Sequence, residues 1–210
     1  MALPQPKYRF DMDAYLAWEE TQTERHEFLA GEVFAMSGGS DAHFTIIGNI
    51  FTELKTRLSG TPCRTFVSGM KVRAEVADAM FYPDVFVTCD ARDKAATARL
   101  AKSHPSLVIE VLSDSTAAYD RGRKFELYQC IPELQEYLIV EQDRMHADLF
   151  RKNPEGLWVL HPAGENDSLD LQSIGVSLPL AQAYVDVDLP PEPPLMDDTP
   201  PAIAAEFGER

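Results

Sequence analysis

The sequence predicts a single α/β (α+β) domain in which a central mixed β-sheet is flanked by helices. Three observations lead to this fold class. A long helix with a regular apolar stripe comes early in the chain, short strand-like runs follow it, and another helix separates these runs from further strands. The length of 210 residues suits one domain with one hydrophobic core.

Helices are predicted from their caps and from the spacing of apolar residues. Asp11 is a suitable N-cap for a short helix over residues 13–21. The strongest helix begins at Ser40, and Phe44 at its start is expected in the core, as is Trp18 of the first helix. Its apolar stripe has steps of three and four: Phe44, Ile47, Phe51, Leu54 and Leu58. A third helix is predicted over about residues 120–130.

Strands are predicted from short runs of β-branched and aromatic residues. The runs lie at 29–36 (a turn and a strand), 63–67, 70–76, 85–88, 107–112, 137–140, 145–150 and 157–160. The composition then changes at Leu189, where the chain becomes rich in proline and acid. We therefore expect residues 1–188 to form the domain and residues 189–210 to form an extended or disordered tail.

The composition also restricts where the chain functions. No apolar run reaches the length of about 18 residues that spans a bilayer, and the N-terminus lacks the apolar core of a signal peptide. The three cysteines, Cys63, Cys89 and Cys130, are far apart and form no CxxC pair. This pattern argues against a disulfide framework and a zinc knuckle. We expect a cytoplasmic protein with no membrane partner.

The net charge of −15 counts against a nucleic-acid partner. The segment from Asp186 onward contributes −6 of this charge, so residues 1–185 still carry −9. An acidic surface repels phosphate backbones. A local basic patch can nevertheless coexist with a negative total.

Glu110 is the residue that most needs an explanation. It lies in the middle of the apolar run 107–112, LVIEVL, which has the character of a strand buried on both faces. A buried carboxylate costs several kcal/mol unless it is neutralised, paired or bound to a metal. A buried ion pair is the simpler reading, and a metal ligand is the functional one.

Asp84 is the second candidate acid. It stands after Pro83 at the start of an apolar strand. A Pro-Asp pair at this place is also ordinary turn chemistry. Asp84 and Glu110 together are more informative, because two acids on two strands of one sheet can converge on Mg²⁺, which prefers carboxylate and water oxygens.

The third helix adds a lysine. Asp120, Lys124 and Tyr128 are four residues apart and share one helix face. A solvated Asp–Lys pair beside a packed tyrosine explains this spacing, but a lysine near metal-bound carboxylates could also stabilise a developing oxyanion. His43 and His26 could lie near such a site, although a lone histidine is more often a packing or surface residue.

Together these stretches resemble the Uma2 family, a branch of the PD-(D/E)xK, restriction endonuclease-like nucleases. The resemblance covers about residues 8–185 and rests on the order and spacing of six motifs. These are Glu27-Phe-Leu-Ala-Gly-Glu32-Val, His43 at the start of the long helix, Pro83-Asp84-Val, Leu107-Val-Ile-Glu110-Val-Leu-Ser113, Asp120…Lys124…Tyr128 and Ile131-Pro-Glu-Leu-Gln-Glu-Tyr137.

The resemblance implies a restriction endonuclease-like core and a role for each motif residue. Asp84 would be the acid of the "PD", Glu110 the second acid, and Glu27 an additional acid, so that these three hold the metal. Lys124 would be the catalytic lysine. The parent motif has its lysine two residues after the second acid, where this chain has Leu112. The role of Lys124 is therefore a hypothesis that the lysine has moved to the following helix.

Two function hypotheses follow. The first is an endonuclease dependent on Mg²⁺ or Mn²⁺ that hydrolyses phosphodiester bonds of nucleic acid, DNA rather than RNA, as a homodimer. The second is a non-catalytic module on the same fold that binds a protein or a nucleic acid. The acids and lysine favour the first hypothesis, and the negative charge favours the second.

Overall fold

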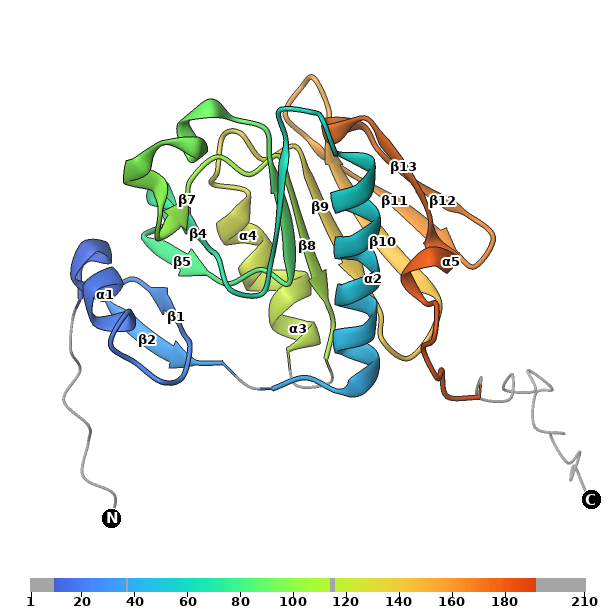
Figure 1. Ribbon diagram of the computed structural model, residues 1–210, viewed down its shortest axis with the longest axis horizontal. Helices are drawn as coiled ribbons and strands as arrows, with labels where there is room; N and C mark the ends of the chain where they lie inside the picture. Colours follow the sequence, from blue (N-terminus) through green and yellow to red (C-terminus); the bar gives the residue numbers. More distant parts are fainter. Residues whose placement is uncertain (1–9, 37, 114–115, 192–210) are drawn as a thin grey trace, which may run out of the picture.

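The computed structural model describes residues 10–36, 38–113 and 116–191. At its centre is a six-stranded mixed sheet with the strand order β11-β10-β9-β8-β6-β3 (Figure 1). A five-stranded sheet has the order β2-β1-β5-β4-β7, and β12 pairs with β13. The predicted α/β fold with a central mixed sheet flanked by helices is confirmed.

The elements have the following bounds. The strands are β1 (His26–Leu29), β2 (Glu32–Ala35), β3 (Arg64–Val67), β4 (Lys71–Ala74), β5 (Ala79–Phe81), β6 (Val85–Thr88), β7 (Ala101–Lys102), β8 (Leu107–Val111), β9 (Glu136–Val140), β10 (His146–Lys152), β11 (Trp158–Gly164), β12 (Ser168–Leu171) and β13 (Val176–Pro179). The α-helices are α1 (Met12–Glu19), α2 (Asp41–Arg57), α3 (Ala117–Tyr119), α4 (Phe125–Tyr128) and α5 (Leu180–Ala183). Between α3 and α4 lies the π-helical turn η4 (Asp120–Lys124), and 3₁₀ turns are η1 (Glu75–Ala77), η2 (Ala91–Lys94), η3 (Ala96–Ala98) and η5 (Gln172–Ile174).

The two strands that carry the candidate acids are neighbours, as predicted. β6 pairs antiparallel with β8, and β8 pairs parallel with β9. All five residues of β8 are buried because both faces of the sheet are covered. Val85 and Ile109 pack with α2 on one face, whereas Val108 packs with Phe125 and Tyr128 on the other. Alternation along β8 therefore points Glu110 towards the helix that carries Lys124.

The N-terminal hairpin belongs to the second sheet. β1 pairs with β2, placing Glu27 opposite Phe34, and it also pairs with β5, placing Phe28 opposite Met80. The sequence predicted only a turn and one strand here and missed β1 and β5. The pairing brings Glu27 close to the segment that runs from β5 to Asp84.

Phe44 corrects the predicted core. Its side chain is 55% exposed. The residues of α2 that are buried are Ile46, Ile47, Ile50 and Leu54. With about 100° of rotation per residue, Phe44 lies roughly a quarter-turn from the centre of this buried arc.

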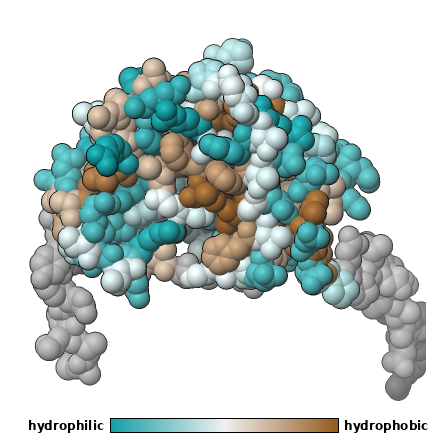
Figure 2. Space-filling view, viewed as in Figure 1, coloured by the Kyte–Doolittle hydropathy of each residue, from teal (hydrophilic) through white to brown (hydrophobic). Residues whose placement is uncertain are grey.

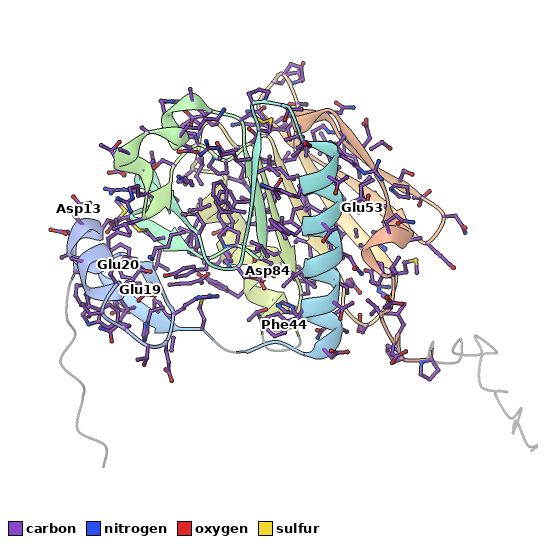
Figure 3. All side chains as sticks on the ribbon, viewed as in Figure 1. Asp13, Glu19, Glu20, Phe44, Glu53 and Asp84 are labelled. Carbon is purple, nitrogen blue, oxygen red and sulfur yellow. A yellow bond between two sulfur atoms is a disulfide. The ribbon has the colours of Figure 1, made fainter. Side chains whose placement is uncertain are left out.

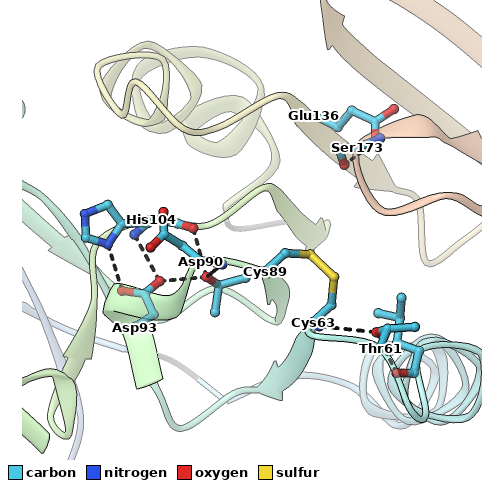
Figure 4. The surroundings of a disulfide bond; sticks show 10 residues. Thr61, Cys63, Cys89, Asp90, Asp93, His104, Glu136 and Ser173 are labelled. Carbon is cyan, nitrogen blue, oxygen red and sulfur yellow. Dashed lines mark hydrogen bonds and ion pairs between the residues drawn. A yellow bond between two sulfur atoms is a disulfide. The ribbon is translucent and has the colours of Figure 1, made fainter. Parts of the chain in front are cut away.

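The cysteine prediction was wrong. Cys63 and Cys89 form a disulfide (Figure 4). Cys130 is a free thiol. β3 and β6 pair antiparallel with Arg64 opposite Thr88, so the two cysteines come next to each other just beyond the last pair. The linear spacing of 26 residues hides this contact, because only the strand register creates it.

The predicted tail lies largely outside the described residues. Residues 192–210 are not described, whereas Val187 and Leu189 pack against the main core. The domain boundary near 188 therefore stays a prediction. No helix in the described ranges has the length and apolarity to cross a membrane.

Candidate active site

A cavity of about 160 Å³ is lined by residues of the hairpin β1–β2, the first turn of α2 and the helix α3–η4. In the view of Figure 1, α3 lies between the hairpin and the start of α2. Its acidic lining residues include Glu27, Asp84, Glu110 and Asp120. Lys124 is the only lysine or arginine among the described lining residues. The four residues predicted from the sequence therefore line one cavity, although four different elements supply them.

Glu110 is almost completely buried at the wall of this cavity. Its side chain is 4% exposed, and Oε1 accepts a hydrogen bond from the Tyr128 hydroxyl at 3.0 Å. The Lys124 Nζ lies 3.0 Å from the same oxygen. Burial raises the pKa of Glu110 well above its usual value, and the nearby charge of Asp84 adds to the rise, while Lys124 opposes it.

Asp84 is held beside β8 by hydrogen bonds that involve backbone amides. Its Oδ2 accepts a hydrogen bond from the Val111 amide at 2.8 Å. The Asp84 amide in turn points at Glu110 Oε2, at 3.4 Å. These reciprocal contacts follow from the antiparallel pairing of β6 and β8, and they hold the two acidic side chains beside each other.

Lys124 binds three carboxylates at once. Its Nζ lies 3.0 Å from Glu110 Oε1, 3.1 Å from Glu27 Oε1 and 3.6 Å from Asp120 Oδ1. Burial alone would disfavour the ammonium, but the charges of Glu110, Glu27 and Asp120 outweigh burial and raise the pKa of Lys124 well above its usual value. Lys124 therefore stays charged at neutral pH.

The π-helical turn directs both Asp120 and Lys124 inward. Both side chains are buried, and the Tyr137 hydroxyl donates a hydrogen bond to the Asp120 carbonyl at 2.9 Å. Single-turn π-bulges are frequent at functional sites. The predicted common face of Asp120, Lys124 and Tyr128 agrees with their contacts, because Lys124 lies 3.6 Å from Asp120 and meets the same Glu110 oxygen as Tyr128. The role of Asp120 as a fourth acid was missed, although its spacing from Lys124 was the available signal.

His43 also faces the site. Its Nε2 lies 3.5 Å from Asp84 Oδ1, and no described group pairs with its buried Nδ1. Gly39 allows this position, because a Cβ at Gly39 would lie 2.3 Å from the His43 ring. Figure 3 shows Asp84 near the start of α2, where Phe44 is labelled. His26 pairs instead with Glu19, at 3.1 Å, and does not line the cavity.

The charges of the cavity fit a divalent metal ion. Among the described lining residues, four carboxyl groups share the cavity with one lysine, so carboxyl groups remain in excess. In the described part of the chain, no three His, Cys, Asp or Glu side chains already form a metal cage. Mg²⁺ does not need one, because it usually binds through one or two carboxylates and keeps its waters or takes substrate phosphates. Asp84 and Glu110 suit this mode.

The mixed sheet, with Glu110 in one strand, Asp84 directly before the neighbouring strand and a buried lysine beside Glu110, is that of a restriction endonuclease-like protein. The chain belongs to the Uma2 family, described as "Putative restriction endonuclease", whose profile matches residues 12–181. The family resemblance inferred from the motifs is thereby confirmed. A nuclease function in general agrees with this membership, as does the divalent metal that such families generally use.

Known proteins support the same grouping. The uncharacterized protein slr1290 of Synechocystis is 41% identical over 179 residues, which cover 85% of this chain and 93% of that protein. The uncharacterized protein sll1609 of the same organism is 34% identical and covers 74% of this chain and 89% of its own length. A crystal structure titled as a putative nuclease belonging to DUF820, from Anabaena variabilis, superposes with a TM-score of 0.68 at 13% identity. It covers 84% of this chain and 98% of the other, which shows a shared fold.

Proposed function

We propose that this protein is an endonuclease, dependent on Mg²⁺ or Mn²⁺, that hydrolyses phosphodiester bonds of nucleic acid, with DNA preferred over RNA. The observation that carries the proposal is the excess of buried and half-buried carboxyl groups over lysine and arginine in the described lining of one cavity. Glu27, Asp84, Glu110 and Asp120 line this cavity together with Lys124, whose single ammonium pairs with Glu27, Glu110 and Asp120. Such a site gains free energy by binding a further cation.

The residues have distinct proposed roles. Asp84 and Glu110 hold the metal, and Glu27 assists from the hairpin. When bound, the metal polarises a phosphate oxygen and lowers the pKa of its water. Lys124 donates to the negative charge that develops on the phosphate. Glu27 and Asp120 keep this lysine charged and aimed into the cavity, through the contacts at 3.1 and 3.6 Å.

A cleavage assay tests the proposal. Plasmid, single-stranded DNA and RNA are incubated with the protein and Mg²⁺, Mn²⁺ or a chelator. We expect metal-dependent cleavage that Asp84→Asn and Lys124→Met abolish. Glu53→Gln is the matched control, because Glu53 is an acid on the outer side of α2 that pairs only with Arg57 among the described residues. Cleavage that survives in the Asp84 variant would remove the assigned site.

The rival proposal is a binding module without catalysis. It is favoured by the contacts of Lys124, which already pairs with Glu110 and Glu27. A module of this kind requires neither cleavage nor a metal response. If the parent protein cleaves no substrate and its melting temperature does not rise with Mg²⁺, this second reading replaces the first.

We also propose a homodimer in the cytoplasm. Two active sites in one assembly suit the cutting of both strands of a duplex. We expect light scattering at micromolar concentration to give twice the chain mass, and a monomer mass would contradict the dimer. The Cys63–Cys89 disulfide removes one of the arguments for a reducing compartment.

A further inference from the structure

A second cavity adjoins the acidic one and differs from it in chemistry. It has a volume of about 380 Å³ and is walled mainly by Phe28, Leu29, Phe34 and Phe81. Some residues line both cavities, namely Glu27, Phe34, Thr116 and Tyr119. The apolar cavity therefore begins where the carboxylate site ends.

Large apolar and aromatic side chains are exposed around these openings. Phe34 is 50% exposed, Tyr119 37%, Met36 36% and Phe44 55%. The first three line the acidic cavity directly, and Phe44 follows His43 in α2. Figure 2, viewed as in Figure 1, shows apolar surface in the middle of the molecule, with hydrophilic side chains around it. Aromatic rings that are left open beside a polar site are typical of a binding surface.

Cations are scarce at the same openings. Among the described residues that line either cavity, Lys124 is the only lysine or arginine, and three carboxylates hold it. Proteins that bind double-stranded DNA neutralise several of its phosphates with lysine and arginine side chains. These walls offer stacking surfaces instead of positive charge. Their chemistry fits a base with an accessible ring face better than the outside of a double helix.

We propose that the nucleotide next to the bond to be cut is unpaired, and that its base enters the apolar cavity and stacks on Phe34 and Tyr119. The substrate class is then single-stranded or locally opened DNA. This inference rests on the proposed nuclease function and adds a base-binding subsite to it. A base inside a duplex cannot reach the cavity, because its neighbours already cover both of its faces. An unpaired base can bind whatever its identity, because every base has a π-face.

Binding of fluorescent oligonucleotides tests the subsite without relying on cleavage. The probe is a single-stranded DNA that contains the fluorescent base 2-aminopurine. Ca²⁺ is used in place of Mg²⁺ in this binding assay, because both ions bind through oxygen ligands. Stacking should quench the fluorescence. Phe34→Ala and Tyr119→Ala should each weaken binding roughly ten-fold, the usual loss for one stacked base. The matched control is Leu157→Ala, which trims an apolar side chain that is 64% exposed and lines neither cavity.

An abasic strand and a duplex complete the experiment. Phe34→Ala should not change the affinity for a strand whose nucleotide at the cut site lacks its base. The parent protein should bind the single strand more tightly than the duplex. Unchanged affinity of both aromatic variants, or equal losses on the abasic strand, would overturn the subsite. These results differ from failure of the nuclease proposal, which is an absence of metal-dependent cleavage. A stacking signal without cleavage would retain the subsite and favour the binding module.

Discussion

At Lys124, three carboxylates compete for one ammonium, and this ratio determines how single substitutions in the site should act. Glu110, Glu27 and Asp120 all lie within 3.6 Å of its Nζ. Removal of one acid leaves the lysine with two partners. Removal of the lysine leaves three acids without this cation. The two kinds of substitution should therefore change stability in opposite directions.

Glu110→Gln should abolish cleavage while leaving the metal-free protein at least as stable as the parent. The raised pKa of Glu110 means that its charge opposes folding, chiefly through burial. The parent should therefore become more stable as the pH falls from neutral through this raised pKa. In this range the folded state binds a proton at Glu110, whereas the unfolded state binds one only near the ordinary glutamate pKa of about 4.3. Thermal melts between pH 4.5 and 8 should show this slope in the parent and not in the variant.

The matched substitution is Lys124→Met, which should lose about 3–5 kcal/mol of stability because buried carboxylates lose their cation. Mg²⁺ should restore part of this loss, by about 2.7 kcal/mol at a hundred times its dissociation constant. In Glu110→Gln the response to Mg²⁺ should be small. A large loss of stability in Glu110→Gln, together with no metal response in the parent, would show that Glu110 serves only as half of an ion pair.

Gly39→Ala should act on catalysis through His43. A Cβ at Gly39 would come within 2.3 Å of the imidazole ring, so the ring must leave its position near Asp84. We expect Gly39→Ala to lower the cleavage rate as much as His43→Ala does, with little change in melting temperature. Gly38→Ala is the control, because a Cβ there meets no described atom within 4 Å. Equal activities of the two glycine variants would contradict a role for the His43 ring.

At the scale of elements, strands were predictable where burial on both faces makes them continuously apolar. β6 and β8 were found within one residue of their bounds for this reason. β5 has only three residues, and β1 carries His26 and Glu27, so neither stands out in the sequence. The position of Glu27 in the site depends on the pairing of β1 with β5. Such a long-range contact leaves no local pattern, and only the family resemblance pointed to Glu27.

The disulfide between β3 and β6 should stabilise the domain. A link across 26 residues restricts the unfolded chain, and the expected contribution is about 3 kcal/mol. The double variant Cys63→Ser/Cys89→Ser should show this loss in urea unfolding under oxidising conditions. Dithiothreitol should destabilise the parent and leave the variant unchanged. Cys130→Ser is the control, since Cys130 is a free thiol. Insensitivity of the parent to reduction would mean that the link contributes little.

At the scale of the whole molecule, the negative charge and the proposed substrate can be reconciled. A net charge of −15 disfavours long-range attraction of DNA. Binding would then depend on the metal and on stacking at the site. The association rate should accordingly be modest and should not fall steeply with salt, unlike that of a basic nuclease.

The acidic C-terminal tail should be dispensable for folding. Leu189 still packs against the core, so a chain that ends at Pro191 keeps this contact. We expect this shortened chain to unfold as cooperatively as the full chain, and limited proteolysis of the full chain to remove the tail first. Truncation before Val187 is the contrasting variant, since it deletes both packed residues. Loss of cooperative unfolding in the longer of the two truncated chains would show that the tail is part of the domain.

The π-helical turn between α3 and α4 lets this helix lose one residue without separating Asp120 from Lys124. The turn from Asp120 to Lys124 accommodates more residues than an α-helical turn does. Deleting one residue there, such as Gly122, would close it to an α-helical turn. Asp120 would then lie three residues before Lys124 and seven before Tyr128, and both spacings keep side chains on one helix face. A related chain that is one residue shorter here would keep its acid and its lysine, and the two chains are paired correctly only when the gap is placed inside this turn.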